Sequence, residues 1–421
     1  MATLVEKWDR VINHKKLPAV KDNHRAEVLA QILENQTQIQ STGNLFEAAP
    51  TNSVGSYASD GTGVAKYDTV LMAMVRRTMP LLMHYDVCGV QAMQLPSQLI
   101  FAMRSRYGAQ DSGIEALFNE ADTDFSGTGT HAGSNWTSGT DTTGTGLSTA
   151  SMEAFGSGTT FNQMSFTIEK IPVEAKGRGL RAEYSTELAE DMKRLHGISA
   201  ESVLTDMLSE EITQEMNREM IRTLYTVAKP GAQLNTQAAG TFNLDVDSNG
   251  RHSAERFQGL LFQLERECNA ISQQTRRGRG NFIICSSDIA SALSIIGKLD
   301  YNPALKADLK IDESSSTFAG MLNGNIKVYI DPYSANQSLT QFAVVGYKGS
   351  NAMDAGLFWC PYIGLQKVNA VDPDTFQPKI GFKTRYGIVA NPFAEGTTSA
   401  LGALNANANV YYRKLKITNI S

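Results

Sequence analysis

The sequence predicts an α+β fold for this chain of 421 residues. Residues 97–107 and 162–177 alternate between polar and apolar side chains, which is the two-residue period of β-strands. Residues 199–228 instead carry an apolar stripe at helical spacing, and such a helix is roughly 40–45 Å long. The apolar run 281–285 leads into a Ser-initiated helical pattern at 286–297, which is one strand-to-helix step. Helices and strands therefore both build the fold.

Residues 1–47 form a separate N-terminal unit, in which six basic residues balance six acids. Helical spacing predicts a helix through Leu4, Trp8 and Ile12, and a second one that Asp22 or Asn23 can cap. Two short amphipathic helices cannot bury their apolar faces alone. They pack either on their own domain or on another protein, and the periodicity is compatible with both.

A long β-hairpin is expected next. Residues 48–66 are small and polar, as in an extended arm or linker. Residues 109–160 contain nine Gly, eleven Thr, seven acids and no Lys or Arg. This composition buries little apolar surface. Since the segment lies between the strand-like runs 97–107 and 162–177, we expect a polar excursion at the tip of the hairpin.

Further elements follow in order along the chain. Ser185 can cap a helix that Gly197 closes, and Ser199 can cap the long helix, which stops at Lys229-Pro230-Gly231. A third helix starts at Ser253. The remaining apolar runs predict strands at 281–285, 326–330, 342–347, 356–360 and 409–417.

Composition excludes several classes of protein. The formal net charge of −5 argues against a nucleic-acid binder that acts through bulk electrostatics. No run of 18 apolar residues predicts a transmembrane helix, and the N-terminus lacks the apolar core of a secretory signal. The four cysteines are far apart in apolar stretches, which indicates buried free thiols and folding in a reducing cytoplasm: Cys88, Cys268, Cys285 and Cys360.

Motifs for catalysis or cofactors are missing: the sequence has no P-loop, no HExxH and no GxSxG. We therefore expect no enzyme, no metal site and no cofactor. Two stretches, 245–250 and 122–127, resemble the first half of an EF-hand loop, but position 12 is Arg256 in one and Gly133 in the other. Asx-Gly turns explain both better. The basic cluster 276–281 can touch phosphate, although a solvated or intersubunit turn fits this acidic chain better.

Long stretches of the chain closely resemble the major capsid proteins of T4-like tailed bacteriophages. The matching stretches are EKWDRVI and ILENQ near the start, MVRRTMPLLMHYDVCGVQAM, EAKGRGLRAEYSTELAEDMKRLHG, EITQEMNRE, GRGNFIICSS, VYIDPY, VGYKGSNAMDAGLFWCPYI and DPDTFQPKIGFKTRYGIVANPFAE. They follow the family order and cover nearly the whole chain, which makes the resemblance far more specific than a short motif.

The resemblance implies the HK97-like capsid fold, with an N-terminal arm, an extended loop, a peripheral domain with a spine helix, and an axial domain. The corresponding segments are 1–47 for a removable helical assembly segment, 48–90 for the arm, 91–180 for the extended loop, 181–279 for the peripheral domain with its spine helix 199–228, 280–360 for the axial domain, and 361–421 for the return to the peripheral domain. T4-like relatives carry a larger folded insertion on the extended loop, whereas 109–160 is short and rich in Gly and Thr.

The resemblance further implies self-assembly into hexameric capsomers that form an icosahedral or prolate head shell around phage DNA, without specific DNA binding. It names as partners a vertex capsid protein, an internal scaffold, a prohead protease, the portal and decoration proteins. The location is then the virion capsid, after assembly in the host bacterial cytoplasm. Two alternatives remain open: a paralogous vertex protein that forms pentamers, and a cellular shell protein of the same fold.

Prohead proteases of this family cleave after Glu in an apolar-x-Glu context. Leu45-Phe46-Glu47, followed by Ala48, matches that pattern where the helical unit ends. The preceding stretch 41–44 is small and polar, and an exposed extended strand is what a protease requires. The resemblance therefore implies processing after Glu47.

Overall fold

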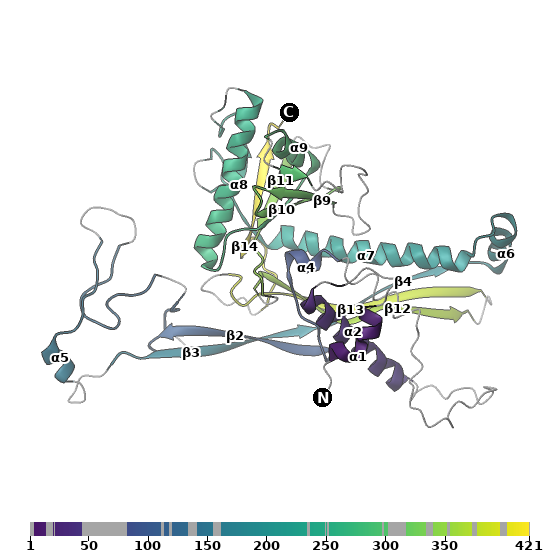
Figure 1. Ribbon diagram of the computed structural model, residues 1–421, viewed down its shortest axis with the longest axis horizontal. Helices are drawn as coiled ribbons and strands as arrows, with labels where there is room; N and C mark the ends of the chain where they lie inside the picture. Colours follow the sequence, from purple (N-terminus) through teal and green to yellow (C-terminus); the bar gives the residue numbers. More distant parts are fainter. Residues whose placement is uncertain are drawn as a thin grey trace.

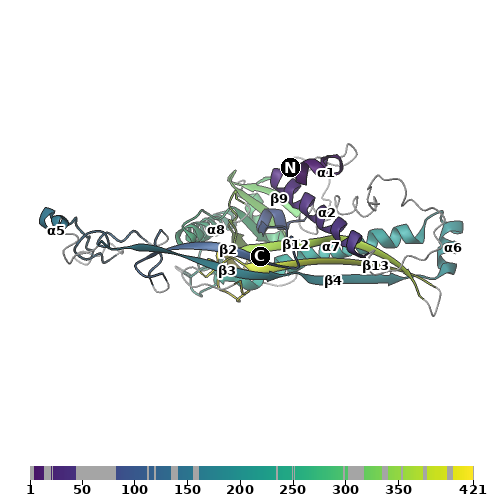
Figure 2. The ribbon, with the colours of Figure 1, turned by 90° about the horizontal axis from the view of Figure 1, so that it is seen from below.

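The computed structural model has the expected α+β composition and is elongated (Figures 1 and 2). The long hairpin projects at one end, and the longest helix reaches the other (Figure 2). The structure describes residues 4–13, 20, 22–43, 82–110, 113–117, 120–133, 141–154, 161–233, 236–248, 250, 252–296, 299–301, 317–333, 340–351, 354–372, 377–395 and 402–420. The expected arm at 48–66 lies outside these residues.

The N-terminal unit consists of two helices, α1 (Leu4–Ile12) and α2 (Asn23–Gly43), which confirms the periodicity. The Asp22 carboxylate accepts a hydrogen bond from the backbone N–H of His24 at 3.1 Å, so Asp22 caps α2. A short helix, α4 (His84–Val87), and the two-residue strand β1 (Gly89–Val90) follow along the chain.

The hairpin is confirmed with its expected strands. β2 (Ser97–Tyr107) pairs antiparallel with β3 (Met164–Glu174), from Ser97 opposite Glu174 to Tyr107 opposite Met164. Between them, the excursion holds only a short helix, α5 (Thr149–Glu153), and isolated bridges within the described residues. The two-stranded ribbon extends away from the main body (Figure 1).

A four-stranded sheet in the order β1-β12-β13-β4 forms one half of the body. Its long strands are β12 (Leu357–Val371), β13 (Pro378–Ala390) and β4 (Lys176–Glu183). The long helix α7 (Ala200–Val227) runs along this sheet, preceded by α6 (Thr186–Leu195) at its far end (Figure 1). The Ser185 hydroxyl caps α6 by accepting from Leu188 N–H, whereas Ser199 stands at the N-cap of α7 without a side-chain capping hydrogen bond.

An eight-stranded sheet forms the other half, in the order β5-β14-β11-β7-β10-β9-β8, with β6 beside β14. Two helices, α8 (Ser253–Thr275) and α9 (Ser287–Ile295), pack on it. Its strands are β5 (Ala228–Pro230), β6 (Thr241–Asn243), β7 (Phe282–Cys285), β8 (Leu299–Tyr301), β9 (Thr317–Leu322), β10 (Ile326–Ile330), β11 (Thr340–Gly346) and β14 (Asn409–Thr418).

Sheet membership differs from the expected segments at two places. The boundary after residue 360 falls inside β12, which pairs with β13 from Leu357 to Val371. The C-terminal strand β14, expected with the peripheral segment, instead pairs with β11 in the eight-stranded sheet. Both differences have the same cause: a short apolar run shows that a strand is buried, but its partner is decided by contacts far away in sequence.

Candidate assembly surfaces

The outward face of the hairpin is an exposed apolar ladder. Residues directly opposite in an antiparallel pair share a face, so alternate residues of β2 and β3 line up on one side. Six large apolar side chains there are 44–66% exposed: Leu99, Phe101, Met103, Met164, Phe166 and Ile168. A monomer rarely exposes so many adjacent apolar groups, so this face has the character of an interaction surface.

The inward face of the hairpin is anchored to the body. Ile100, Ile171 and Val173 are 1–3% exposed and form a second hydrophobic core with Phe358 and Val389 of the four-stranded sheet. The same two strands are therefore a packed layer on one side and an uncovered surface on the other.

Arg104 on β2 holds the part of the hairpin next to the excursion against the body. This residue is only 1% exposed. Its guanidinium contacts Glu115 at 2.7 Å and Glu169 at 2.9 Å, and it donates to the carbonyl of Pro392 at 2.9 Å. It also lies 4.6 Å from the ring centroid of Phe393. Burial raises the pKa of Glu115, although Arg104 acts in the opposite direction.

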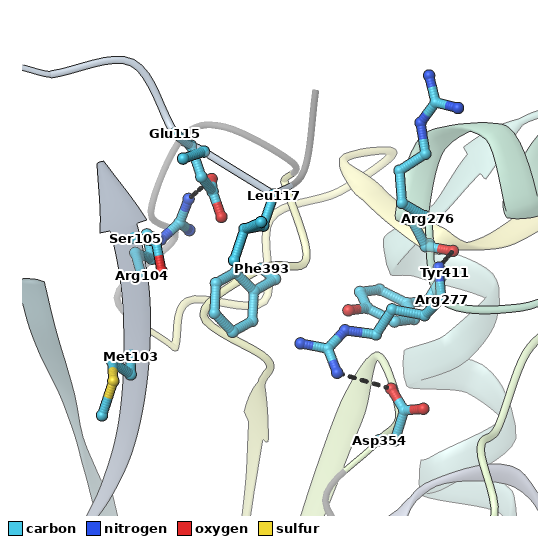
Figure 3. Close-up of a pocket in the computed structure, with 12 residues that line it drawn as sticks. Met103, Arg104, Ser105, Glu115, Leu117, Arg276, Arg277, Asp354, Phe393 and Tyr411 are labelled. Atoms are coloured by element: carbon cyan, nitrogen blue, oxygen red, sulfur yellow. Dashed lines mark hydrogen bonds and ion pairs between the residues drawn. The ribbon is translucent and has the colours of Figure 1, made fainter. Parts of the chain in front are cut away.

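A cavity of about 440 Å³ lies between this part of the hairpin and the body. Figure 3 shows Phe393 and Leu117 between two ion pairs, Arg104–Glu115 on the hairpin and Arg277–Asp354 on the body. Arg277 comes from the basic cluster 276–281, and Arg279 of this cluster pairs with Glu265 on α8. Two of the cluster's arginines are therefore committed to ion pairs within the chain.

The excursion contributes almost nothing to the core. Among its described residues only Glu115 and Ala116, which lie beside the last residues of β2, are buried. Local hydrogen bonds organise its tip: Asp124 accepts from the backbone of His131 at 2.7 Å, and Thr123 accepts from the backbone of Gly144 at 2.8 Å. Three further acids of the excursion, Glu120, Asp141 and Glu153, are exposed, which leaves the tip negatively charged.

The N-terminal helices pack on their own subunit, which is the first of the two alternatives that the periodicity allowed. Leu29, Ile32 and Leu33 of α2 are fully buried in the main core. The Asn35 amide donates to the carbonyls of Met93 at 2.6 Å and Tyr362 at 2.9 Å. The processing residues Leu45, Phe46, Glu47 and Ala48 lie outside the described residues.

The candidate calcium loops form turns with internal partners. Asp245 pairs with Arg256, the residue at position 12 of that loop, and Asp247 accepts from the backbone N–H groups of Gln237 and Asn243. Asp122 accepts from the backbone of Asp124. Within the described residues, no group of three His, Cys, Asp or Glu side chains is placed to hold a metal ion.

All four cysteines are buried and unpaired, as predicted. Burial raises the pKa of each thiol to about 12. The described part of the chain has no helix with the length and apolar content to cross a membrane.

Comparison with known proteins identifies the family. The family model for the major capsid protein Gp23 matches residues 64–417. The major capsid protein of Serratia phage KSP90 is 36% identical over 96% of both chains, and that of Enterobacteria phage T4 is 32% identical over 100% of this chain and 99% of the relative. The chain belongs to the Gp23 major capsid protein family. It is a component of the phage capsid that forms the head shell.

The vertex alternative is weaker. The capsid vertex protein of phage T4 is 26% identical over only 54% of this chain. The alignment with the T4 major capsid protein spans 524 positions for a chain of 421 residues, so part of the T4 protein has no counterpart here.

Solved structures with a similar chain include the capsid of Myoviridae phage XM1, with a TM-score of 0.41, 9% identity, and coverage of 78% of this chain and 88% of that one. An empty GTA particle gives a TM-score of 0.37, 10% identity, and coverage of 90% and 98%. The family assignment rests on the sequence relatives.

Sequence reasoning found the hairpin of this Gp23 family member but missed what its two faces do. Alternation predicted both strands, yet it could not tell which side the body covers. The sequence does not mark Arg104 as an anchor, because a charged residue in an alternating strand usually faces solvent. Its acceptor at Pro392 lies 288 residues away along the chain.

Proposed function

We propose that this Gp23 family member assembles into hexameric capsomers through its hairpin, whose apolar ladder packs on the next copy around the ring. The observation that carries this proposal is the row of six apolar side chains, 44–66% exposed, on a strand pair whose other face is already anchored. The hairpin of one copy contacts a different surface of the next, which is a heterologous contact, and repetition of such a contact closes a ring.

The partners and the place of assembly are inferred from the resemblance to the family. We propose that capsomers form in the host cytoplasm on an internal scaffold, and that a vertex protein, the portal, the prohead protease and decoration proteins complete the head. The chain acts by assembly rather than by catalysis, with no metal or nucleotide. The net charge of −5 suits a shell that encloses DNA without binding it specifically.

We further propose processing after Glu47, with a physical consequence. Because α2 is buried against the subunit through Leu29, Ile32 and Leu33, a cut between Glu47 and Ala48 does not by itself free the helices. Release then requires the subunit or its neighbours to rearrange. Mass spectrometry of capsid protein from infectious particles tests the cleavage: a chain that begins at Ala48 supports it, and an intact N-terminus refutes it.

The assembly proposal is tested by electron microscopy and sedimentation of the purified full chain. We expect rings, tubes or shells, in the presence of EDTA and without nucleotide. The double variant Phe101→Asp/Phe166→Asp should remain a folded subunit and fail to assemble. Burying the two new carboxylates in the contact between subunits would cost free energy, because they would lose their hydration without gaining a partner. Phe262→Asp, which changes a Phe on α8 that is 69% exposed, is the matched control and should assemble. Normal assembly of the hairpin variant contradicts the proposal.

A further inference from the structure

The helices α1 and α2 form a pair that lies on one side of the body (Figure 2). Glu34 of α2 accepts hydrogen bonds from Lys7 Nζ at 2.7 Å and from Trp8 Nε1 at 3.1 Å, both on α1. These contacts join the two helices to each other, so they stay intact if the pair leaves the body. The contact between the pair and the body is called the α2 seam here, and its buried residues on α2 are Leu29, Ile32, Leu33, Asn35 and Gln36.

The charged groups at the α2 seam remain paired when its two sides separate. Arg25 of α2 contacts Asp86 of α4 at 3.4 Å, and Lys327 of β10 contacts the same carboxylate, also at 3.4 Å. Asp86 therefore keeps a cation if α2 leaves, while Arg25 keeps Asp22 at 3.8 Å within its own unit. Breaking a contact is most costly where it leaves a buried charge without a partner, and separation here leaves none of these three groups in that state.

Gln36 lies in the α2 seam without a hydrogen bond. It follows Ile32 by four residues, so it shares the buried face of α2, and it is 1% exposed. Neither its amide nitrogen nor its amide oxygen has a hydrogen-bond partner among the described residues. Most buried polar groups are hydrogen-bonded, and one that is left unpaired costs the free energy of its lost hydration. Gln36 therefore weakens the docked state, and it regains hydration when α2 leaves.

The body side of the α2 seam contains a second unpaired group. Tyr85 of α4 is 5% exposed, and the Arg25 guanidinium lies 4.9 Å from the centroid of its ring, so α2 lies over this residue. The Tyr85 hydroxyl has no hydrogen-bond partner in the part of the chain that the structure describes. Withdrawal of α2 gives this hydroxyl access to water. Both sides of the seam therefore gain hydration when they separate.

Other contacts define a single docked position for α2. The Asn35 amide donates to two carbonyl oxygens of the body, and His24 Nε2 lies 2.9 Å from the carbonyl oxygen of Val90. Leu29, Ile32 and Leu33 fill the apolar part of the contact. The seam thus combines a specific position with a lowered free energy of separation.

We propose that the α2 seam is a contact built for release, in which the unpaired groups of Gln36 and Tyr85 lower the free energy needed to withdraw the N-terminal unit. The inference rests on the proposed processing after Glu47, and opening of the seam is the rearrangement that release requires. While residues 1–47 are linked to the rest of the chain, a withdrawn unit stays at a high effective concentration and docks again. After the cut, a withdrawn unit diffuses away.

Hydrogen exchange in the full, uncut chain measures the opening of the seam. The amides of α2 should exchange faster than those of β12 and β13. Gln36→Met keeps the length and helix propensity of the side chain but removes the unpaired amide, so it should slow exchange throughout α2 at least ~tenfold. Gln263→Met on α8 is the matched control, because Gln263 is 4% exposed but its amide donates to Glu267 at 2.7 Å. The control should lower the melting temperature and leave the exchange of α2 unchanged.

Tyr85→Phe removes the second unpaired group and should also slow the exchange of α2. Its control is Tyr412→Phe, which removes a hydroxyl that accepts from the backbone N–H of Leu357 at 3.1 Å and should therefore lower the melting temperature. The inference requires both Gln36→Met and Tyr85→Phe to slow exchange. Unchanged or faster exchange of α2 in either variant, or failure of either to fold, overturns it.

Mass spectrometry of infectious particles connects the seam to processing. Particles that carry Gln36→Met should retain more of the 1–47 fragment than unmodified particles, and equal retention overturns the role of the seam in release. If unmodified particles keep an intact N-terminus, the processing proposal fails, whereas the exchange measurements still decide whether the seam is weak. If cleavage occurs but the variants leave the exchange of α2 unchanged, this inference fails and the processing proposal stands.

Discussion

Asp331, at the end of β10, accepts hydrogen bonds from Arg218 Nη1 on α7 with both carboxylate oxygens, each at 2.7 Å. The Tyr225 hydroxyl of the same helix donates to Asp331 at 2.8 Å. Asp331 is 1% exposed, and the backbone N–H of Tyr333 also donates to this buried carboxylate at 3.0 Å. The cluster joins the long helix to the eight-stranded sheet, and thereby links the two halves of the body.

Replacing Asp331 with alanine should destabilise the subunit by about 3 kcal/mol, because the substitution leaves a partly buried guanidinium and a phenol without their acceptor. Urea unfolding of the unassembled subunit measures the change. The control is Glu190→Ala, which breaks an ion pair whose side chains are 70–80% exposed, and it should shift stability by less than ~0.5 kcal/mol. Equal effects from both variants would contradict a structural role for Asp331.

Arg104→Met should loosen the hairpin from the body, because Glu115 and Glu169 then remain nearly buried without their cation. We expect faster amide hydrogen exchange in residues 97–107 and 164–174, with little change in the eight-stranded sheet. Adding Glu115→Gln and Glu169→Gln should restore much of the protection, since the triple variant buries no unpaired charge. Unchanged exchange in the single variant would show that the hydrophobic contacts of Ile100 and Ile171 suffice.

Local signals in the sequence predicted most individual elements. The strands 97–107 and 162–177 and the helix 199–228 have clear periods, and the structure places β2, β3 and α7 there. A serine or glycine at a helix end, as at Ser185 and Gly197, marks where the helix starts or stops. These predictions need only contacts between residues that are near in sequence.

Long-range contacts could not be predicted in the same way. The run 356–360 reads as a buried strand, but its membership in the four-stranded sheet depends on β13, whose paired residues are as much as 33 positions later. Likewise, the apolar side chains of 97–107 and 162–177 are visible in the sequence, whereas their alignment on one face of the hairpin depends on the register of two distant strands. Assembly surfaces are defined by such registers, and they emerge only from the structure.

Asn35→Asp should weaken the docking of α2. The amide nitrogen of Asn35 donates to two carbonyl oxygens, and a carboxylate in its place would face both without a proton to share. We expect a loss of about 2 kcal/mol, seen as earlier proteolysis of the N-terminal segment and a lower melting temperature. Glu27→Gln, on the exposed side of the same helix, should change neither. An Asn35→Asp variant with normal protection would show that the apolar contacts of α2 alone hold it.

Deleting residues 126–158 should leave a folded subunit, because the described residues of this range bury no side chain. Hydrophobic burial stabilises by about 25 cal/mol per Å² of apolar surface, and this segment supplies little of it. We expect a far-UV circular dichroism spectrum and a melting temperature close to those of the full chain, together with impaired assembly. Loss of soluble folded protein would place the excursion in the core.

His84 should make the subunit sensitive to acid. Its ring is fully buried, 4.5 Å from the ring centroid of Trp359, and burial lowers its pKa from 6.5 to about 3, against the opposing effect of the Asn217 side chain. Between these two values the unfolded chain binds a proton that the folded subunit does not. The stability that neutral His84 contributes is therefore fully present above pH 6.5 and falls as the pH drops towards 3, by at most ~1.4 kcal/mol per pH unit.

Urea unfolding between pH 4 and 7 should show a shallower pH dependence of the unfolding free energy for His84→Phe than for the unmodified chain. This holds even if the two proteins differ in stability at pH 7. His196→Phe, which replaces an exposed histidine after α6, should keep the original dependence. Equal slopes for His84→Phe and the unmodified chain would mean that His84 is protonated in the folded subunit.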